Sequence, residues 1–244
     1  MKSKTNGATG VARVLDAGRW LAGFAAAILA LVGLSTARAA ADTGGSSIVV
    51  AQVQARAMAS RAVGTGHAAT PAGLVAAKPL TVFAPISADG KTVASVDLER
   101  YLGRWYEIAT YPIPAQRNCA ATTATYGLND NGTVSVFNEC RRGGLEGRYD
   151  SIRGYAKIVD SETNAKLKVF FFPIFGAPYW VIEADGRGGD QPYDWAVVGS
   201  SSRSFLWILS RTPQMDETRL AAILERLAAR GYDIGKLKFT EQPK

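Results

Sequence analysis

Histidine and cysteine are nearly missing from this chain of 244 residues, which has one histidine and two cysteines. These numbers exclude an all-cysteine zinc site, a zinc-finger site with a pair of histidines, and a haem held by two histidines. The one histidine, His67, lies in the sequence Gly-Thr-Gly-His of residues 64–67, which is typical of a solvated linker. A Ser-His-Asp triad would therefore lack its histidine in any folded domain, and we expect no metal and no other cofactor.

Acidic residues are scarce in the first third of the chain. The formal net charge of +7 is by itself typical of a protein that binds nucleic acid or an anionic membrane. Residues 1–92, however, contain nine Lys or Arg and only three Asp, so they account for +6 of that charge. The rest of the chain is nearly neutral, and we therefore expect no nucleic-acid partner.

Residues 20–37 form an uncharged, apolar stretch that basic residues precede and the sequence Ala37-Arg38-Ala39 follows. These are the parts of a secretory signal, with cleavage expected after Ala39. An uncleaved N-terminal anchor is the alternative, because a stretch of this length is at the lower limit of a membrane span. No cysteine directly follows the stretch, so the acylation site of a bacterial lipoprotein is absent. We predict an exported protein of the periplasm or cell envelope.

Residues 40–92 are dominated by Ala, Gly, Ser, Thr and Val, with no strongly marked buried face. This composition predicts a mostly disordered, low-complexity spacer. The chain is thus expected to consist of a signal or anchor over residues 1–39, a spacer over 40–92 and one folded domain over 93–244.

From residue 93 the sequence changes to short β-rich runs between turn sequences. Asn129-Asp130-Asn131-Gly132 is a strong hairpin signal, because these residues tolerate positive φ. The predicted strands are 104–111, 122–128, 134–138, 152–159, 166–172, 179–184, 195–198 and 205–210. Eight antiparallel strands in hairpin order predict an all-β, up-and-down barrel that is wide enough for one small ligand.

One helix is predicted after the eighth strand, with Thr212 as its cap, Pro213 in its first turn and Gly231 at its end. Four apolar side chains follow the i, i+3, i+4, i+7 spacing of a helix face. They are Leu220, Ile223, Leu224 and Leu227. We expect this face to pack on the outside of the barrel and a short strand over residues 237–240 to follow.

Three segments carry a resemblance to a known family. Residues 101–108, YLGRWYEI, closely resemble the opening G-x-W motif of the lipocalins, and residues 206–213, LWILSRTP, resemble their closing motif. Residues 192–198 resemble a loose version of the middle motif and depart from its usual Thr-Asp-Tyr core. The resemblance covers about residues 93–243 and is greatest to the branch of the bacterial outer-membrane lipocalins and apolipoprotein D.

The resemblance implies structural roles for Gly103, Trp105 and Arg211. In the family the motif Trp closes the base of the barrel and the motif Arg lies across its ring. Such a contact in a partly desolvated site contributes about 1–2 kcal/mol.

Cys119 and Cys140 flank the predicted hairpin around Gly132, which brings their neighbourhoods together. An exported protein permits a disulfide between them, worth about 3 kcal/mol in the chain-entropy model. A reactive thiol, as in the prostaglandin-synthase lipocalin, is the alternative.

Strand parity places alternate side chains of the third, fifth and eighth strands inside the barrel. By resemblance to apolipoprotein D, Tyr126, Asn138 and Trp207 also lie at pocket-lining positions. The predicted ligand-binding residues are Tyr126, Val136, Asn138, Val169, Phe171 and Trp207. In the alternative interpretation these residues simply fill a small barrel, and a slip of one residue would exchange Phe171 for its neighbours.

The predicted function is to carry or store a fatty acid or lysophospholipid in the bacterial cell envelope, without catalysis. The first alternative is a lipocalin-fold isomerase or de-epoxidase, for which Glu107 and Glu183 are the available strand carboxylates. The second is an interaction module that the spacer holds near a membrane partner. The apolar loop over residues 172–178 could contact a membrane surface, and Arg141 and Arg142 could meet an anionic head group.

Overall fold

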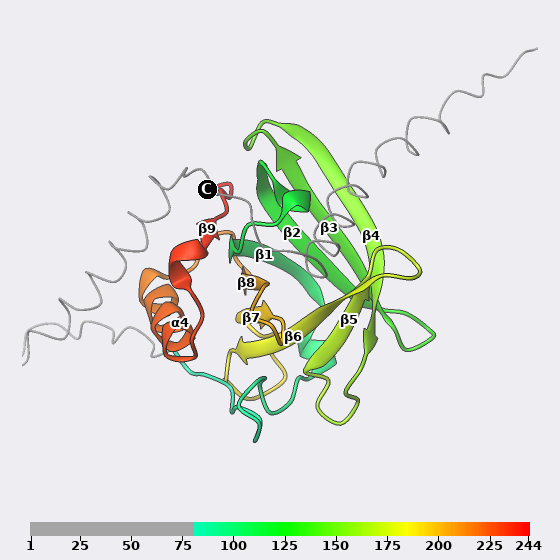
Figure 1. Ribbon diagram of the computed structural model, residues 1–244, viewed down its shortest axis with the longest axis vertical. Helices are drawn as coiled ribbons and strands as arrows, with labels where there is room; N and C mark the ends of the chain where they lie inside the picture. Colours follow the sequence, from blue (N-terminus) through cyan, green and yellow to red (C-terminus); the bar gives the residue numbers. More distant parts are fainter. Residues whose placement is uncertain (1–80) are drawn as a thin grey trace, which may run out of the picture.

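Short runs of alternating apolar and polar residues form the wall of a barrel in residues 81–244, the part of the chain that the computed structural model describes (Figure 1). A short helix, α3 (Leu98–Tyr101), precedes the barrel, and a short strand, β9 (Lys238–Phe239), follows it. The strands of the barrel are β1 (Gly103–Thr110), β2 (Cys119–Leu128), β3 (Val134–Arg142), β4 (Arg148–Ile158), β5 (Lys166–Phe170), β6 (Gly176–Ala184), β7 (Trp195–Gly199) and β8 (Leu206–Ser210).

The barrel is closed because β1 pairs on both of its edges. Gly103 of β1 lies opposite Tyr126 of β2, and Tyr106 of β1 lies opposite Ser210 of β8. Between these two pairings, strands that are neighbours in sequence pair antiparallel in order from β2 to β8. The predicted eight-stranded, antiparallel up-and-down barrel is therefore confirmed.

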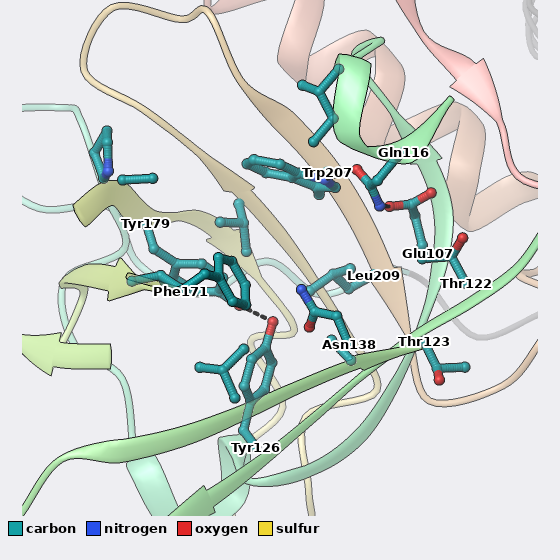
Figure 2. Close-up of a pocket in the computed structure, with 17 residues that line it drawn as sticks. Glu107, Gln116, Thr122, Thr123, Tyr126, Asn138, Phe171, Tyr179, Trp207 and Leu209 are labelled. Carbon is teal, nitrogen blue, oxygen red and sulfur yellow. Dashed lines mark hydrogen bonds between the residues drawn. The ribbon is translucent and has the colours of Figure 1, made fainter. Parts of the chain in front are cut away.

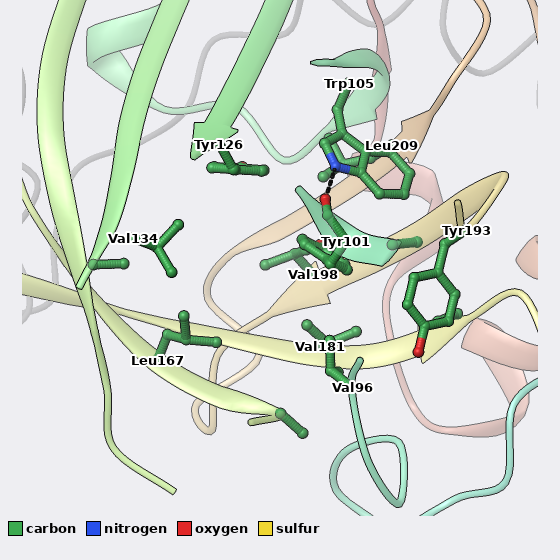
Figure 3. Packing of buried hydrophobic residues seen from close by; sticks show 14 of the residues in the cluster. Val96, Tyr101, Trp105, Tyr126, Val134, Leu167, Val181, Tyr193, Val198 and Leu209 are labelled. Atoms are coloured by element: carbon green, nitrogen blue, oxygen red, sulfur yellow. Dashed lines mark hydrogen bonds between the residues drawn. The ribbon is translucent and has the colours of Figure 1, made fainter. Parts of the chain in front are cut away.

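The side chains of β5 that point into the barrel are the ones predicted from strand parity. Leu167 and Val169 are buried inside the barrel, and Phe171 beyond the strand faces the same interior. Phe170 instead lies on the outer face, where its ring stacks on Tyr155 with 5.2 Å between the ring centroids. Buried side chains such as Val134 and Leu167 line the half of the barrel next to α3 (Figure 3).

Helix α4 (Glu217–Ala229) packs against the outer wall of the barrel, as predicted (Figure 1). The four predicted apolar side chains of α4 are buried against outward-facing residues of β1, β6, β7 and β8. Burial of each such side chain contributes roughly 1.5–3 kcal/mol. Gly231 follows the helix with φ of 79°, a conformation that favours glycine at a helix end.

The predicted helix cap at Thr212 is wrong. The cap is Asp216, whose carboxylate accepts hydrogen bonds from the backbone N–H groups of Thr218 and Arg219. Thr212 instead donates its hydroxyl to the carbonyl oxygen of Gln214, at 2.6 Å. Asp216 is a better cap than Thr212 because its carboxylate satisfies two free N–H groups of the first turn and carries a negative charge at the positive end of the helix.

Residues 82–92 pack on the barrel, although the sequence places them in the spacer. Ala84 is buried, and the ring of Phe83 meets the ring of Trp195 edge to face, with 5.2 Å between the centroids. Arg230, directly after α4, also donates hydrogen bonds to the carbonyl oxygens of Gly90 and Lys91. The packed part of the chain therefore includes residues that precede position 93.

The predicted signal or anchor over residues 1–39, most of the predicted spacer and His67 lie outside the described residues. Within residues 81–244, no helix is both long and apolar enough to cross a membrane.

A disulfide joins Cys119 at the start of β2 to Cys140 of β3, as predicted. It encloses the hairpin formed by these two strands and lies against Ile113, Ala115 and Ile152. These contacts attach the segment between β1 and β2 to the barrel wall.

Trp105 and Arg211 close the base of the barrel, the end next to α3. Trp105 is fully buried and donates its indole N–H to the carbonyl oxygen of Tyr101, at 2.8 Å (Figure 3). The Arg211 guanidinium lies over the indole ring, with 3.8 Å from Cζ to the centroid. It also donates hydrogen bonds to the carbonyl oxygens of Arg100, Tyr101, Leu102, Arg104 and Tyr193.

Gly103 leaves room for this arginine. Its φ is 93°, which favours glycine, and a Cβ there would lie 3.3 Å from Nη1 of Arg211. The glycine, tryptophan and arginine of the two motifs thus form one structural unit.

Replacement of Arg211 by Ala is expected to lower the free energy of unfolding by about 3 kcal/mol, because it leaves several carbonyl groups without their donor. Chemical denaturation measures the loss. Arg104→Ala is the matched control, because Arg104 is exposed at the same end of β1 and should change stability by less than about 0.5 kcal/mol. Equal stability of the two variants would contradict the role of Arg211.

Candidate functional site

A cavity occupies the half of the barrel away from the base (Figure 2). It encloses about 740 Å³ of atom-free space, including the part that opens to solvent. The lining residues are Glu107, Ile113, Gln116, Thr122, Thr123, Ala124, Tyr126, Val136, Asn138, Val169, Phe171, Ala177, Pro178, Tyr179, Val198, Trp207 and Leu209.

All six residues of the predicted ligand site lie around this cavity. They come from β2, β3, β5 with the residue after it, and β8, so the closed barrel brings together positions that are distant in sequence. Val136 and Val169 supply apolar wall, while Tyr126, Asn138 and Trp207 add polar atoms to it. The structure therefore places these residues where a ligand inside the barrel would touch them.

A partly buried polar cluster lies on the side of the cavity where Glu107, Gln116 and Trp207 meet (Figure 2). Gln116 donates its amide N–H to Oε2 of Glu107, at 2.7 Å, and accepts the indole N–H of Trp207 at its own Oε1, at 3.2 Å. Thr240 donates its hydroxyl to Oε1 of Glu107, at 2.5 Å. The cluster ties β1, β8 and the C-terminal segment to η1 (Pro114–Gln116), the 3₁₀ turn between β1 and β2.

Burial raises the pKa of Glu107, and the hydrogen bonds from Thr240 and Gln116 lower it in part. The described residues that line the cavity include no lysine, arginine or histidine. The carboxyl group therefore has hydrogen bonds but no cation in the cavity wall, and burial favours its neutral form.

Three further polar atoms in the wall have no hydrogen-bond partner within residues 81–244. They are the hydroxyl oxygens of Thr122 and Thr123 and the side-chain carbonyl oxygen of Asn138. Buried polar atoms are normally satisfied by protein groups, water or ligand. The Asn138 amide points into the cavity (Figure 2), where its oxygen can accept a hydrogen bond from a hydroxyl or amide group of a bound molecule.

Tyr126 and Tyr179 form the opposite side of the cavity, where the Tyr179 hydroxyl donates to the Tyr126 oxygen at 3.1 Å (Figure 2). Burial raises the pKa of Tyr126 to about 12, and the nearby Glu107 carboxyl contributes to the increase. Burial also raises the pKa of Tyr179 well above its usual value. Both phenols therefore stay protonated and uncharged at neutral pH.

Several lining residues were not predicted as ligand-site residues from the sequence. Parity could have found Glu107, two residues after Trp105, and Tyr179, two residues before the inward-facing Val181. Thr122 lies two residues before the lining residue Ala124, so parity could have found it as well, whereas Thr123 has the opposite parity and only borders the cavity.

Gln116 lies in η1, where no strand parity applies. Its position follows from the contacts of the surrounding turn, which only the folded chain brings together.

The two strand carboxylates named for the enzyme alternative lie on opposite sides of the barrel wall. Glu107 faces the cavity, whereas Glu183 is fully buried beneath α4. Oε1 of Glu183 forms ion pairs with Nε of Arg226 at 2.8 Å and Nη1 of Arg230 at 2.5 Å. These two carboxylates therefore do not form an acid-base pair.

Arg142 holds the turn that carries Gln116. It forms an ion pair with Asp150 and donates hydrogen bonds to the carbonyl oxygens of Ala115 and Arg117, at 2.9 and 3.0 Å. Neither Arg142 nor Arg141 lines the cavity. Residues 81–244 also contain no group of three or more His, Cys, Asp or Glu side chains arranged to hold a metal ion.

A closed antiparallel barrel with a sealed base and an apolar inner cavity defines a class of small-ligand-binding barrels. A family model described as a lipocalin-like domain matches residues 96–242. The chain belongs to the lipocalin family, whose members bind small hydrophobic ligands.

Three relatives show how the similarity is distributed. Temperature-induced lipocalin-1 of Arabidopsis thaliana is 42% identical over 162 residues, 62% of this chain and 82% of that protein. Outer membrane lipoprotein Blc of Escherichia coli K12 is 36% identical over 177 residues, 72% of this chain and 94% of Blc. Apolipoprotein D of Mus musculus is 33% identical over 155 residues, 60% of this chain and 77% of that protein.

Insecticyanin from the tobacco hornworm Manduca sexta shares the fold. Its structure aligns with a TM-score of 0.51 and 20% identity, over 67% of this chain and 90% of insecticyanin.

Glu107→Gln is expected to become more stable relative to the wild type as pH rises from about 4 to about 8. A raised pKa in the folded state means that Glu107 favours folding most at low pH, and that this stability is lost as pH increases toward the folded-state pKa. Gln is uncharged and can keep hydrogen bonds to Gln116 and Thr240. Urea denaturation of both proteins across this pH range measures the difference, and a constant difference would contradict the prediction.

Proposed function

We propose that this protein binds and carries or stores a fatty acid or a lysophospholipid in the bacterial cell envelope. The cavity is the observation that carries the proposal, because apolar side chains from most of the barrel strands surround it. A long hydrocarbon chain matches such a wall, and each buried methylene contributes about 0.8 kcal/mol. The outer membrane lipoprotein and apolipoprotein D relatives support a lipid ligand.

The polar atoms of the cavity support an amphiphilic ligand rather than a plain hydrocarbon. Glu107, Gln116 and Trp207 lie on one side, and Asn138 adds an unpaired acceptor to the wall. Hydroxyl, ester or carboxyl groups of a lipid can exchange hydrogen bonds with these side chains while the chain fills the apolar space.

We infer that the protein acts as a binding protein and not as an enzyme. The buried carboxyl of Glu107 is held by Gln116 and Thr240, which is consistent with positioning a ligand. Glu183 is engaged by Arg226 and Arg230 outside the cavity.

The location in the envelope rests on the N-terminal sequence and on a relative. Residues 20–37 with Ala37-Arg38-Ala39 have the pattern of an export signal, either cleaved or retained as an anchor. Blc of Escherichia coli is named an outer membrane lipoprotein. This chain lacks a cysteine directly after the apolar stretch, so its attachment would differ from acylation of such a residue.

Trp207 provides the test, because its indole lines the cavity. Palmitic acid or lysophosphatidylcholine is expected to change the tryptophan fluorescence of the wild type, and Trp207→Phe should remove most of that change. Trp180→Phe is the matched control, because Trp180 packs in the apolar cluster between the barrel and α4 and should leave the change intact.

Native mass spectrometry after mild extraction provides a second measurement, in which a co-purifying acyl lipid is expected. An empty barrel whose fluorescence also fails to respond to either lipid would overturn the proposed function.

We further propose that the loop between β5 and β6 contacts a membrane surface. Ile174 is 80% exposed and Phe175 is 54% exposed, whereas large apolar side chains are mostly buried in soluble domains. The neighbouring Phe171 and Pro178 line the cavity, so the loop lies at its mouth. An apolar loop at this position would place the mouth against the lipid from which a ligand enters.

The double variant Ile174→Ser/Phe175→Ser is expected to bind phosphatidylglycerol vesicles about tenfold more weakly than the wild type, because two apolar side chains no longer enter the lipid. Vesicle flotation measures the bound fraction. Val159→Ser is the control, because Val159 is 66% exposed in the turn between β4 and β5, next to the base. Equal binding by all three proteins would contradict the contact.

A further inference from the structure

Three tyrosine side chains form a hydrogen-bonded chain inside the barrel. Tyr101 comes from α3, Tyr126 from β2 and Tyr179 from β6. The hydroxyl oxygens of Tyr101 and Tyr179 lie 2.8 Å apart, and those of Tyr179 and Tyr126 lie 3.1 Å apart. The Tyr101 and Tyr126 rings also stack, with 6.0 Å between their centroids.

The chain of tyrosines crosses the full width of the barrel. In the closed sheet, β2 and β6 are separated by β3, β4 and β5 on one side and by β1, β8 and β7 on the other. These two strands are therefore diametrically opposite. A direct contact between the Tyr126 and Tyr179 hydroxyls means that the two side chains reach across the bore and meet near its axis.

A second compartment lies on the base side of these tyrosines. It encloses about 380 Å³ of atom-free space, including any part that opens to solvent, and shares Tyr126, Val136, Val169 and Tyr179 with the cavity above. Its remaining lining residues are Val96, Leu98, Tyr101, Leu102, Val134, Ala156, Asn164, Leu167 and Val181. Asn164 is engaged, because its amide donates to the carbonyl oxygen of Val96 at 3.4 Å.

The lower compartment is thus lined mainly by hydrocarbon, and the tyrosine rings lie between it and the cavity. Trp105 and Arg211 seal the barrel below it. This compartment can accept an uncharged, wholly apolar end of a ligand chain. A polar group there would lose its hydrogen bonds to water.

We propose that the Tyr101, Tyr126 and Tyr179 chain is the floor of the ligand cavity and sets the longest hydrocarbon chain that the wild-type protein holds. The compartment beneath is a second binding site for the end of a longer chain, and it becomes available when the contact between Tyr126 and Tyr179 is removed. This inference rests on the proposed function as a lipid-binding protein.

The experiment compares straight-chain alcohols from octanol to eicosanol, which carry the same uncharged head group at every length. Binding is followed through the fluorescence of Trp207. Wild-type affinity is expected to rise about fourfold for each added methylene and then to stop rising at a limiting length. In Tyr179→Leu the limit should move to longer alcohols, which should bind at least about fourfold more tightly than they bind the wild type.

Tyr155→Leu is the matched control, because Tyr155 lies on the outer face of β4 against Phe170. It should reproduce the wild-type limit. Should Tyr179→Leu fail to fold, as judged by circular dichroism, Tyr179→Phe replaces it. This variant keeps the ring and removes both hydroxyl contacts, so we expect a shift in the same direction but of smaller size.

Three results would overturn the inference. The first is a variant whose chain-length profile superimposes on that of the wild type, and the second is an equal shift in Tyr155→Leu. In both cases the proposed function stands, because the wild type binds alcohols. The third is an absence of binding at every length in all proteins, which overturns the proposed function and this inference together.

Discussion

The contact of Arg211 with Trp105 is the interaction on which the rest of the barrel depends. A closed sheet of eight strands has two open ends, and a ligand cavity needs one of them sealed. The buried indole fills the base, and the guanidinium over it satisfies carbonyl groups of α3, of the start of β1 and of the segment before β7. One side chain thereby joins segments that are about a hundred residues apart, and it does so with charge-assisted hydrogen bonds.

The interior changes in character from this base to the mouth. Apolar side chains and the tyrosine chain lie toward the base, and the cluster of Glu107, Gln116 and Trp207 lies in the cavity above. The strongly charged groups remain outside the bore, where Glu183 pairs with Arg226 and Arg230 beneath α4. An interior with polar side chains at one level and hydrocarbon at another suits an amphiphilic molecule, which also has a polar part and an apolar part.

The turn between β1 and β2 shows how structural contacts position a cavity residue. The disulfide at Cys119 and the hydrogen bonds of Arg142 to Ala115 and Arg117 fix the backbone within η1 and directly after it. Gln116 is consequently held between Glu107 and Trp207. An arginine that the sequence suggests as a head-group contact thus acts on the cavity indirectly, through the turn that it supports.

Local sequence alone determined the strands, the helix face of Leu220 to Leu227, the hairpin at Gly132 and, through strand parity, the inward direction of Val169 and Phe171. These features depend on the period of the backbone and on the conformations that each residue tolerates. Only the tertiary structure decided the packing of residues 82–92, the place of Gln116 in the cavity wall, and the meeting of Tyr126 with Tyr179. Those features arise from contacts between segments distant in sequence, which local spacing does not encode.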